Sequence, residues 1–586
     1  MREKLFRLMQ NFAGFAFVIF IYTLTAFGQT YIQNVTVVDV ENQKLLSGQT
    51  VVVKDATISE IAPANKIKPP ANANVINGGG KFLMPGMTDS HVHFFQSGGL
   101  YARPDAIDLR KYQPYQKEIA WTHDNMEDLL RRYLKAGITT VIDVGSTYNF
   151  LSLRNNFADK DFAPKIYMTG PLMTTYLPAP YKDLKKDSPF NLVTNIEEAK
   201  KAFDEQMQYK PDFIKVWYIV DSKNAEESAK KFEPVFKSIV EEAHKNNLKV
   251  AVHATERITA EISVKNGADF LVHSVDDAII SDEFVQMMKN NGTILCPTLT
   301  VSHGYSDTFG QKTEFSFYDL MTANPFQVGT ITDLKHIPEP ALIEQYKKIM
   351  NSAAYVERKK SEDAMMRANL KKLSDAGVTI AAGTDAGNIG TQHASSFIGE
   401  LEAMKESGLT NWQILESATI NPAKIFDAEN KTGSVTVGKQ ADLILLEANP
   451  VETLENLKKI NLVFNNGKSF SPADLLIETP ESLAQKQLIA YNARDLEAFL
   501  EPYADDVEIY EFPDKLRYKG KETMRKQYGE MFAKFPELHC EIKGRIVQGD
   551  IVIDRESVSG IGQNKIEATA IYQIKNGKIA KVYFIR

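Results

Sequence analysis

The sequence predicts an α/β fold built on a (β/α)8 barrel and followed by a separate α+β segment. From about residue 85 to residue 426, short apolar strand-like runs alternate with amphipathic helical patterns. Such alternation predicts a parallel sheet, and a closed barrel is the natural form for roughly 340 residues of it. After residue 480 the pattern changes to one helical stretch followed by several strands.

The first 28 residues are typical of a secretory signal peptide. Arg2, Lys4 and Arg7 form a basic start, residues 12–24 are almost wholly apolar, and Ala26 and Gly28 precede Gln29. A permanent membrane anchor is the alternative, but the apolar run is shorter than the roughly 20 residues that a spanning helix needs. We therefore expect cleavage, and a periplasmic or secreted protein without membrane attachment.

Composition excludes several classes of partner and site. The net charge is −7, so nothing indicates the basic face that nucleic-acid binding needs. The chain has 2 cysteines, Cys296 and Cys540, far apart in the sequence. A disulfide framework is therefore not expected, and a zinc site made mainly of cysteine is excluded.

Strand-like runs also lie on both sides of the barrel segment. Residues 35–40, 50–53 and 57–61 precede it, and residues 441–446 and 462–464 follow it, with Asn466-Gly467 as a hairpin turn. Within the barrel segment we expect strands at 137–144, 213–217, 248–253, 268–273, 293–296 and 378–382, and helices at 232–247 and 365–376. Residues 471–480 read as a linker, and residues 481–586 as the α+β domain.

Histidines and one aspartate close several of these runs. His91 and His93 end the run after Pro85-Gly86 and, being two apart in a strand, project to one face. His253, His273 and Asp385 also lie at strand ends, and carboxyl ends of barrel strands meet at one mouth. A single such histidine is more often a polar cap, but their joint occurrence predicts a metal site, because imidazole and carboxylate suit zinc and similar ions.

Together these motifs resemble the amidohydrolase superfamily, in its prolidase-like and imidazolonepropionase-like branch. The segments on which the resemblance rests are residues 85–93, the strand ends at His253, His273 and Asp385, residues 416–423, and residues 433–443. The resemblance implies a metal-dependent hydrolase domain at 85–430. It also implies that residues 29–84 and 431–470 form a small composite β-sandwich flanking the barrel.

Lys215, near the end of the predicted strand at 213–217, determines whether the resemblance implies one metal ion or two. In the prolidase-like branch a lysine at this place is carboxylated and bridges two divalent ions. His91, His93 and Asp385 would then hold one ion, and His253 and His273 the other. A Lys215 that reaches solvent instead would leave one ion. Zinc is the expected metal, although manganese and cobalt accept the same ligands.

The resemblance further implies hydrolysis by water that the metal activates, with Asp385 moving the proton. The expected substrates are small molecules with amide or peptide bonds, such as dipeptides, including Xaa-Pro, or N-acyl amino acids. The alternatives are hydrolysis of cyclic amides, lactones or esters, and a binding protein without catalysis. Thr255 stands where dipeptidases of the branch often have Tyr; Arg257, Tyr218 and Tyr176 are candidate substrate contacts.

Residues 481–586 resemble a SnoaL-like (NTF2-like) domain. The segments at 488–500 and 503–507 are similar to the opening helix and first strand of that fold, and 519–522 and 576–579 fit as well. The resemblance implies a pocketed α+β domain that often dimerises, so we expect a homo-oligomer formed through it and assign it no chemistry.

Overall fold

The computed structural model describes residues 29–221 and 223–585. The predicted signal peptide, residues 1–28, lies outside the described residues. Within the described part, no helix combines the length and the apolar character that a membrane span requires.

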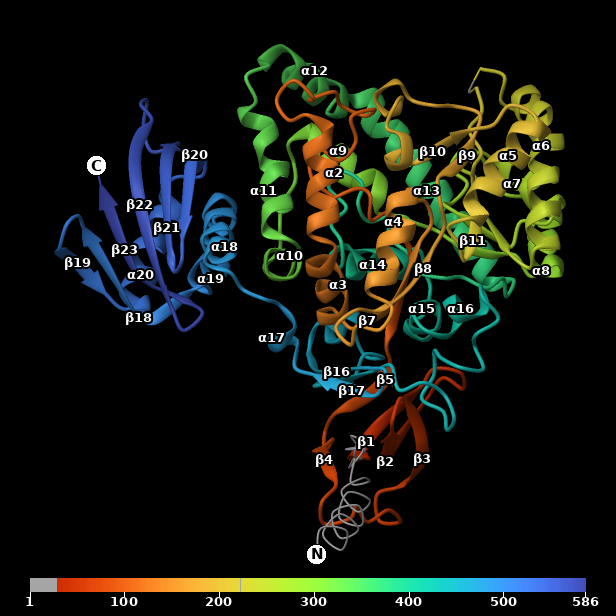
Figure 1. The fold of residues 1–586 in the computed structure, drawn as a ribbon, viewed down its shortest axis with the longest axis horizontal. Helices are drawn as coiled ribbons and strands as arrows, with labels where there is room; N and C mark the ends of the chain where they lie inside the picture. Colours follow the sequence, from red (N-terminus) through yellow and green to blue (C-terminus); the bar gives the residue numbers. More distant parts are fainter. Residues whose placement is uncertain (1–28, 222, 586) are drawn as a thin grey trace, which may run out of the picture.

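The barrel wall consists of two parallel sheets and a closing segment (Figure 1). One sheet has the order β6-β7-β8, and the other has the order β10-β9-β11-β12-β13-β14. Residues 165–174 join them, because β8 pairs with β7 whereas β9 pairs with β11. These strands are β6 (Met87–Val92), β7 (Ile138–Asp143), β8 (Lys165–Met168), β9 (Leu172–Thr174), β10 (Phe190–Leu192), β11 (Phe213–Trp217), β12 (Lys249–His253), β13 (Phe270–Val272) and β14 (Ile294–Cys296).

Residues 379–386 close the wall between the last strand and the first. The Ala381 amide donates to the Leu295 carbonyl at 2.8 Å, and the Asp385 amide donates to the His91 carbonyl at 2.7 Å. The predicted α/β barrel is thereby confirmed, and residues from its first and last strands become neighbours.

Side chains alternate between the inside and the outside of this wall, as strand geometry dictates. Phe213, Ala251 and Phe270 belong to the core inside the barrel, whereas their chain neighbours Ile214, Val250 and Leu271 pack outside against the helices. Lys215 and His253 each follow an inward residue by two positions, so both continue the inward rows toward the barrel mouth.

The predicted helices at 232–247 and 365–376 are confirmed as parts of α6 (Ala225–Lys245) and α13 (Ala353–Asp375). The helical insertion between β14 and the closing segment was not predicted. Its short helices are broken by turn-forming residues such as Ser316 and Asn324, which cap them but read as loop in the sequence. They are α9 (Val301–Gly310), α10 (Phe317–Thr322), α11 (Pro325–Asp333) and α12 (Pro340–Met350).

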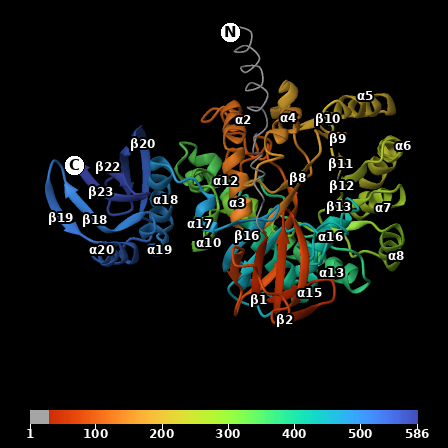
Figure 2. The same cartoon turned by 60° about the horizontal axis from the view of Figure 1, so that its bottom comes forward.

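Strands from both sides of the barrel segment join in one eight-stranded sheet of order β17-β16-β15-β5-β1-β2-β3, with β4 paired to β1. Its inner side chains, among them Val37, Leu83 and Leu443, form a core separate from the barrel. Figure 2 shows β1 and β2 of this sheet facing forward beneath the barrel. The strands are β1 (Thr30–Asp39), β2 (Lys44–Lys54), β3 (Thr57–Pro63), β4 (Asn74–Asn77), β5 (Phe82–Pro85), β15 (Leu443–Leu446), β16 (Ile460–Asn465) and β17 (Lys468–Phe470).

The carboxyl-terminal domain has a six-stranded sheet of order β19-β18-β23-β22-β21-β20. The helical pattern at 481–500 is two helices, because Arg494 takes a left-handed conformation (φ 57°) and ends the first one. The elements are α18 (Pro480–Ala493), α19 (Leu496–Leu500), β18 (Tyr503–Glu511), β19 (Lys515–Lys519), α20 (Lys521–Lys534), β20 (His539–Gln548), β21 (Ile551–Ser559), β22 (Ile566–Lys575) and β23 (Lys578–Ile585).

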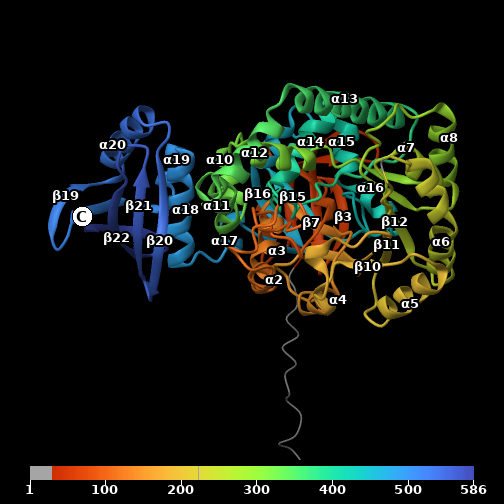
Figure 3. The ribbon, with the colours of Figure 1, turned by 90° about the horizontal axis from the view of Figure 1, so that it is seen from above.

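This domain packs against the helical insertion of the barrel. Figures 1 and 3 both place α18 beside α10 and α11. Leu320 and Val328 of the insertion share one buried core with Leu483 and Ile489 of α18. The two domains are therefore held by a common apolar contact in addition to the segment after α17 (Pro472–Leu475).

This shared core predicts that Leu320→Ala destabilises the full chain. Leu320 is 0% exposed, and a buried Leu→Ala change costs about 2–5 kcal/mol because it leaves a cavity. We expect a melting temperature several degrees lower in calorimetry. Phe317→Ala on the same helix is the control, since Phe317 is 48% exposed; equal melting temperatures for the two variants would contradict a shared core.

Candidate metal centre

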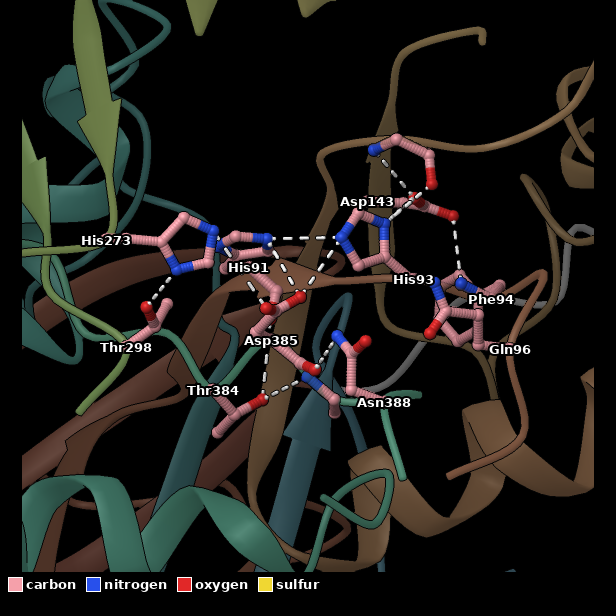
Figure 4. A network of polar contacts seen from close by, with 12 residues as sticks. His91, His93, Phe94, Gln96, Asp143, His273, Thr298, Thr384, Asp385 and Asn388 are labelled. Atoms are coloured by element: carbon pink, nitrogen blue, oxygen red, sulfur yellow. Dashed lines mark hydrogen bonds and ion pairs between the residues drawn. The ribbon is translucent and has the colours of Figure 1, made fainter. Parts of the chain in front are cut away.

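The two histidines of the first strand converge with the aspartate of the closing segment (Figure 4). His91, at the end of β6, and His93 just beyond it are both buried. Asp385 Oδ1 lies 3.1 Å from Nε2 of each histidine, and the two Nε2 atoms are 3.2 Å apart. One nitrogen from each imidazole and one carboxylate oxygen thus surround a common point.

The orientation of His93 is fixed from the next strand. Its Nδ1 lies 2.7 Å from the Gly145 carbonyl oxygen, which can only accept, so Nδ1 carries the proton and Nε2 presents its lone pair toward Asp385. Asp143 holds this loop by accepting hydrogen bonds from the amides of Gly145 and Phe94, each at 3.2 Å. A carbonyl behind a ligating histidine is the usual support of a metal ligand.

A buried carboxylate also holds the closing segment against the first strand. Asp89 accepts from the Thr384 amide at 3.0 Å and from the Thr384 hydroxyl at 2.8 Å. Burial raises the pKa of Asp89 to about 7, although these donors act against the shift. The contact sets the position of Asp385, the next residue, relative to His91.

His253 and His273 lie on the other side of the centre. Their ring centroids are 4.3 Å apart, and His273 Nε2 is 4.0 Å from Asp385 Oδ2. His273 Nδ1 is held by the Thr298 hydroxyl at 2.6 Å. His273, Thr298 and Asp385 have φ of 75°, 47° and 60°, and left-handed non-glycine residues gathered at one place indicate strain maintained at a functional site.

Lys215 is buried among these groups, with 1% of its surface exposed. On β11 it pairs with Ala251, two residues before His253 on β12. Burial lowers the pKa of Lys215 to about 7, with Asp385 opposing that shift. Within the described part of the chain, its ammonium has no hydrogen bond or ion pair, which is unusual for a buried lysine.

The protonation states suit a cation. Burial lowers the pKa of His91 to about 4 and moves the pKa of His253 and His273 well below the ordinary value. Burial alone would raise the pKa of Asp385, but His91 and His93 outweigh it and hold that pKa well below its usual range. Neutral imidazoles and an ionised carboxylate are the states in which these side chains bind metal.

Unsatisfied atoms provide a further test of fit. Asp385 Oδ1 is buried and makes no hydrogen bond among the described residues, although two imidazole nitrogens lie close to it. Buried polar atoms normally have a partner. A divalent cation between Asp385, His91 and His93 would supply one, so the residues present fit a metal.

The sequence-predicted substrate contacts are not brought together at this centre. The Tyr218 hydroxyl donates to the Ala229 carbonyl at 2.7 Å, and its ring packs among helix residues outside the barrel. Arg257 is engaged in ion pairs with Glu261 at 2.7 Å and Glu226 at 3.5 Å. These contacts direct the side chains of Tyr218 and Arg257 away from the metal centre. Tyr176 remains near the mouth: it is 53% exposed, and its ring centroid is 6.2 Å from that of Trp217.

A polar network that bonds to the backbone of Asp385 was not predicted from the sequence. Asn388 donates to the Asp385 carbonyl at 3.0 Å. Its side-chain oxygen accepts from Arg103 Nη1 and from the Tyr305 hydroxyl, each at 2.6 Å. Asn388 stands three residues after Asp385 in a glycine-rich loop, which is a signal for a positioning role. Nothing local in the sequence connects it with Arg103 or Tyr305.

Known proteins share both parts of this architecture. The model of the amidohydrolase family matches residues 82–470, and that of the SnoaL-like domain matches residues 484–582. Ochratoxinase of Aspergillus niger is 24% identical over 411 residues, 66% of this chain and 75% of that protein. Imidazolonepropionase of Brevibacillus brevis is 34% identical over 105 residues, 17% of this chain and 24% of its own.

A solved Xaa-Pro dipeptidase with bound methionine in its active site has the same fold, with a TM-score of 0.57 and 22% identity over 76% of this chain and 100% of its own. The family model covers well over half of the chain and includes every strand that contributes to the metal centre. The chain therefore belongs to the amidohydrolase family, as a metal-dependent hydrolase of carbon–nitrogen bonds with a SnoaL-like domain at its carboxyl end.

Proposed function

We propose that this protein hydrolyses the amide bond of small open-chain substrates, such as dipeptides or N-acyl amino acids. One observation carries the proposal: His91, His93 and Asp385 converge at the barrel mouth, with one imidazole nitrogen from each histidine and one carboxylate oxygen around a common point. The dipeptidase of the same fold, with an amino acid bound in its active site, supports this substrate class.

We infer two divalent ions, with zinc the expected metal. His91, His93 and Asp385 would hold one, and His253 and His273 the other. The Lys215 amine is buried without an ion pair among the described residues, and burial lowers its pKa to about 7. In its neutral form it would add to CO2 and release a proton, and the resulting N6-carboxylate would supply an anionic ligand for both ions. When bound, such ions supply Lewis-acid activation of water and of the scissile carbonyl.

The chain's own residues would handle the proton. The pKa of Asp385 is held well below its usual range, and its Oδ1 accepts no hydrogen bond among the described residues, so it can accept a proton from the attacking water and pass it to the leaving nitrogen. The Asn388 contact to the Asp385 carbonyl, together with the Asp89–Thr384 contact, keeps this carboxylate in place during the transfer.

The leading alternative is hydrolysis of ring amides, lactones or esters. It is favoured by the local match to imidazolonepropionase and by Thr255, which stands where dipeptidases of this branch often have tyrosine. A binding protein without catalysis is the remaining alternative. It is disfavoured because every residue of the centre is present. We further propose that the basic and apolar start directs export, and that the carboxyl-terminal domain mediates a homo-oligomer.

Asp385→Asn should lower kcat by about 10²–10⁴-fold, because the amide cannot accept the proton. Asparagine keeps an oxygen donor, so much of the metal should remain by elemental analysis. Asp282→Asn removes the same charge at an exposed position (85% side-chain exposure) and should keep normal turnover. Unchanged turnover in Asp385→Asn would refute the role of Asp385.

Lys215→Ala should change the metal content. We expect about two divalent ions per chain in the parent protein and about one in the variant, measured by elemental analysis after dialysis against zinc. Lys230→Ala, at an exposed helix position, should match the parent. One ion per chain in both the parent and Lys215→Ala would show that Lys215 bridges nothing.

A substrate panel separates the open-chain amide proposal from its alternatives. It comprises Xaa-Pro and other dipeptides, N-acetyl amino acids, a cyclic imide, a lactone and an ester, each assayed with zinc- or manganese-loaded protein. We expect the highest kcat/KM on a dipeptide or N-acyl amino acid. Turnover confined to the ring compounds or the ester would establish the alternative, and no turnover at all would favour a binding role.

A further inference from the structure

The carboxyl-terminal domain contains a cavity of about 270 Å³ between its sheet and the helices α18 and α20. Its inner end is made of buried residues from α18 and three strands, among them Gln487, Tyr503, Glu556 and Tyr572. Its mouth is marked by exposed residues such as Arg517. The cavity therefore runs inward from the surface and ends at a polar floor.

Glu556 is the group at this floor that lacks a full set of partners. It is 6% exposed, and one of its oxygens accepts from the Tyr572 hydroxyl at 2.8 Å. Tyr572 in turn accepts from the Gln487 amide at 3.0 Å, which fixes the direction in which its hydroxyl donates. The other oxygen of Glu556 has no hydrogen bond among the described residues.

A second buried acid on the same strand differs from Glu556 because it has a cationic partner. Asp554 is 0% exposed, and Arg545 donates to both of its oxygens at 2.7 Å. Glu556, two residues later on the same face of β21, has no such cation. Because a buried carboxylate without a cation is costly, its position at the floor of a cavity points to a cationic partner that is not part of the chain. Burial raises the pKa of Glu556 to about 7, as expected while that partner is absent.

The walls of the cavity are aromatic. Phe499 and Tyr528 have ring centroids 4.4 Å apart, and Tyr491 lies 6.3 Å from Tyr528. In the described structure the hydroxyls of Tyr491 and Tyr528 have no hydrogen-bond partner. Aromatic rings around a carboxylate are the combination that recognises an organic cation, since ring faces and the carboxylate both attract positive charge.

We propose that this cavity is a second ligand site, separate from the metal centre, which binds a small ring-bearing amine with its cationic nitrogen at Glu556. Its volume, below the usual range for drug-sized ligands, limits the occupant to about one ring with a short chain. Arg517 at the mouth is exposed to solvent, where its repulsion of a cation is screened. The site does not depend on the hydrolase activity.

Titration calorimetry of the full chain with 2-phenylethylamine tests the site, with 2-phenylethanol and 3-phenylpropionate as neutral and anionic counterparts. We expect the amine to bind at one site per chain, about tenfold or more tightly than either counterpart, because a charged contact to Glu556 is added. Equal affinity for the amine and the alcohol, or preference for the acid, would overturn the proposal.

Variants locate the binding. Glu556→Gln should lower the affinity for the amine about tenfold or more and leave the affinity for the alcohol unchanged. The control variant Glu522→Gln removes a charge at an exposed position of α20 (87% side-chain exposure) and should change neither affinity. Ala568→Leu, which fills the cavity, should abolish binding of both the amine and the alcohol. This variant tests the location of the site if Glu556→Gln fails to fold. Amine binding that survives these changes but is lost in His91→Ala would place it at the metal centre and refute the site.

Discussion

The metal centre depends on the closure of the barrel between its first and last strands. The hydrogen bond from the Asp385 amide to the His91 carbonyl, at 2.7 Å, brings a carboxylate to two histidines that are remote in sequence. The closing segment can approach so closely because Gly383 has no side chain: a Cβ there would lie 2.7 Å from the His91 amide nitrogen. This contact, together with the Asp89–Thr384 contact, places Asp385 beside His91 and His93.

Burial then determines the chemistry of the residues so assembled. Desolvation keeps His91 neutral, whereas the neighbouring imidazoles keep Asp385 ionised. The same desolvation leaves Lys215 a poor cation. Neutral imidazoles and an ionised carboxylate are the forms in which these side chains can share a divalent ion. Among the described residues, the carboxyl-terminal domain contains another buried acid without a cation. Glu556 accepts a hydrogen bond from Tyr572 but lacks an arginine like the one that pairs with Asp554.

The alternating strands and helices and the strand-terminal histidines could be predicted from the sequence because both are local patterns. His91 and His93 lie at the end of one strand, with His93 just beyond it, and the other ligands end runs of clear periodicity. Thr298 and Arg103 could not be predicted, because their roles arise from loops that meet only after the barrel closes. Asn388 has a local signal in its position after Asp385, but its contacts with Arg103 and Tyr305 could not be predicted. Tyr218 and Arg257 follow strands in sequence but are drawn to Ala229 and Glu261 instead, and the insertion helices are too short to show a period.

Anomalous diffraction at the zinc absorption edge from crystals of the zinc-loaded chain would show whether His91, His93 and Asp385 hold a metal. We expect an anomalous peak at about 2.0–2.2 Å from Nε2 of His91, Nε2 of His93 and a carboxylate oxygen of Asp385, the distances that zinc takes to nitrogen and oxygen ligands. Zinc bound only elsewhere in the chain, with these three side chains free of it, would show that they do not form the metal centre.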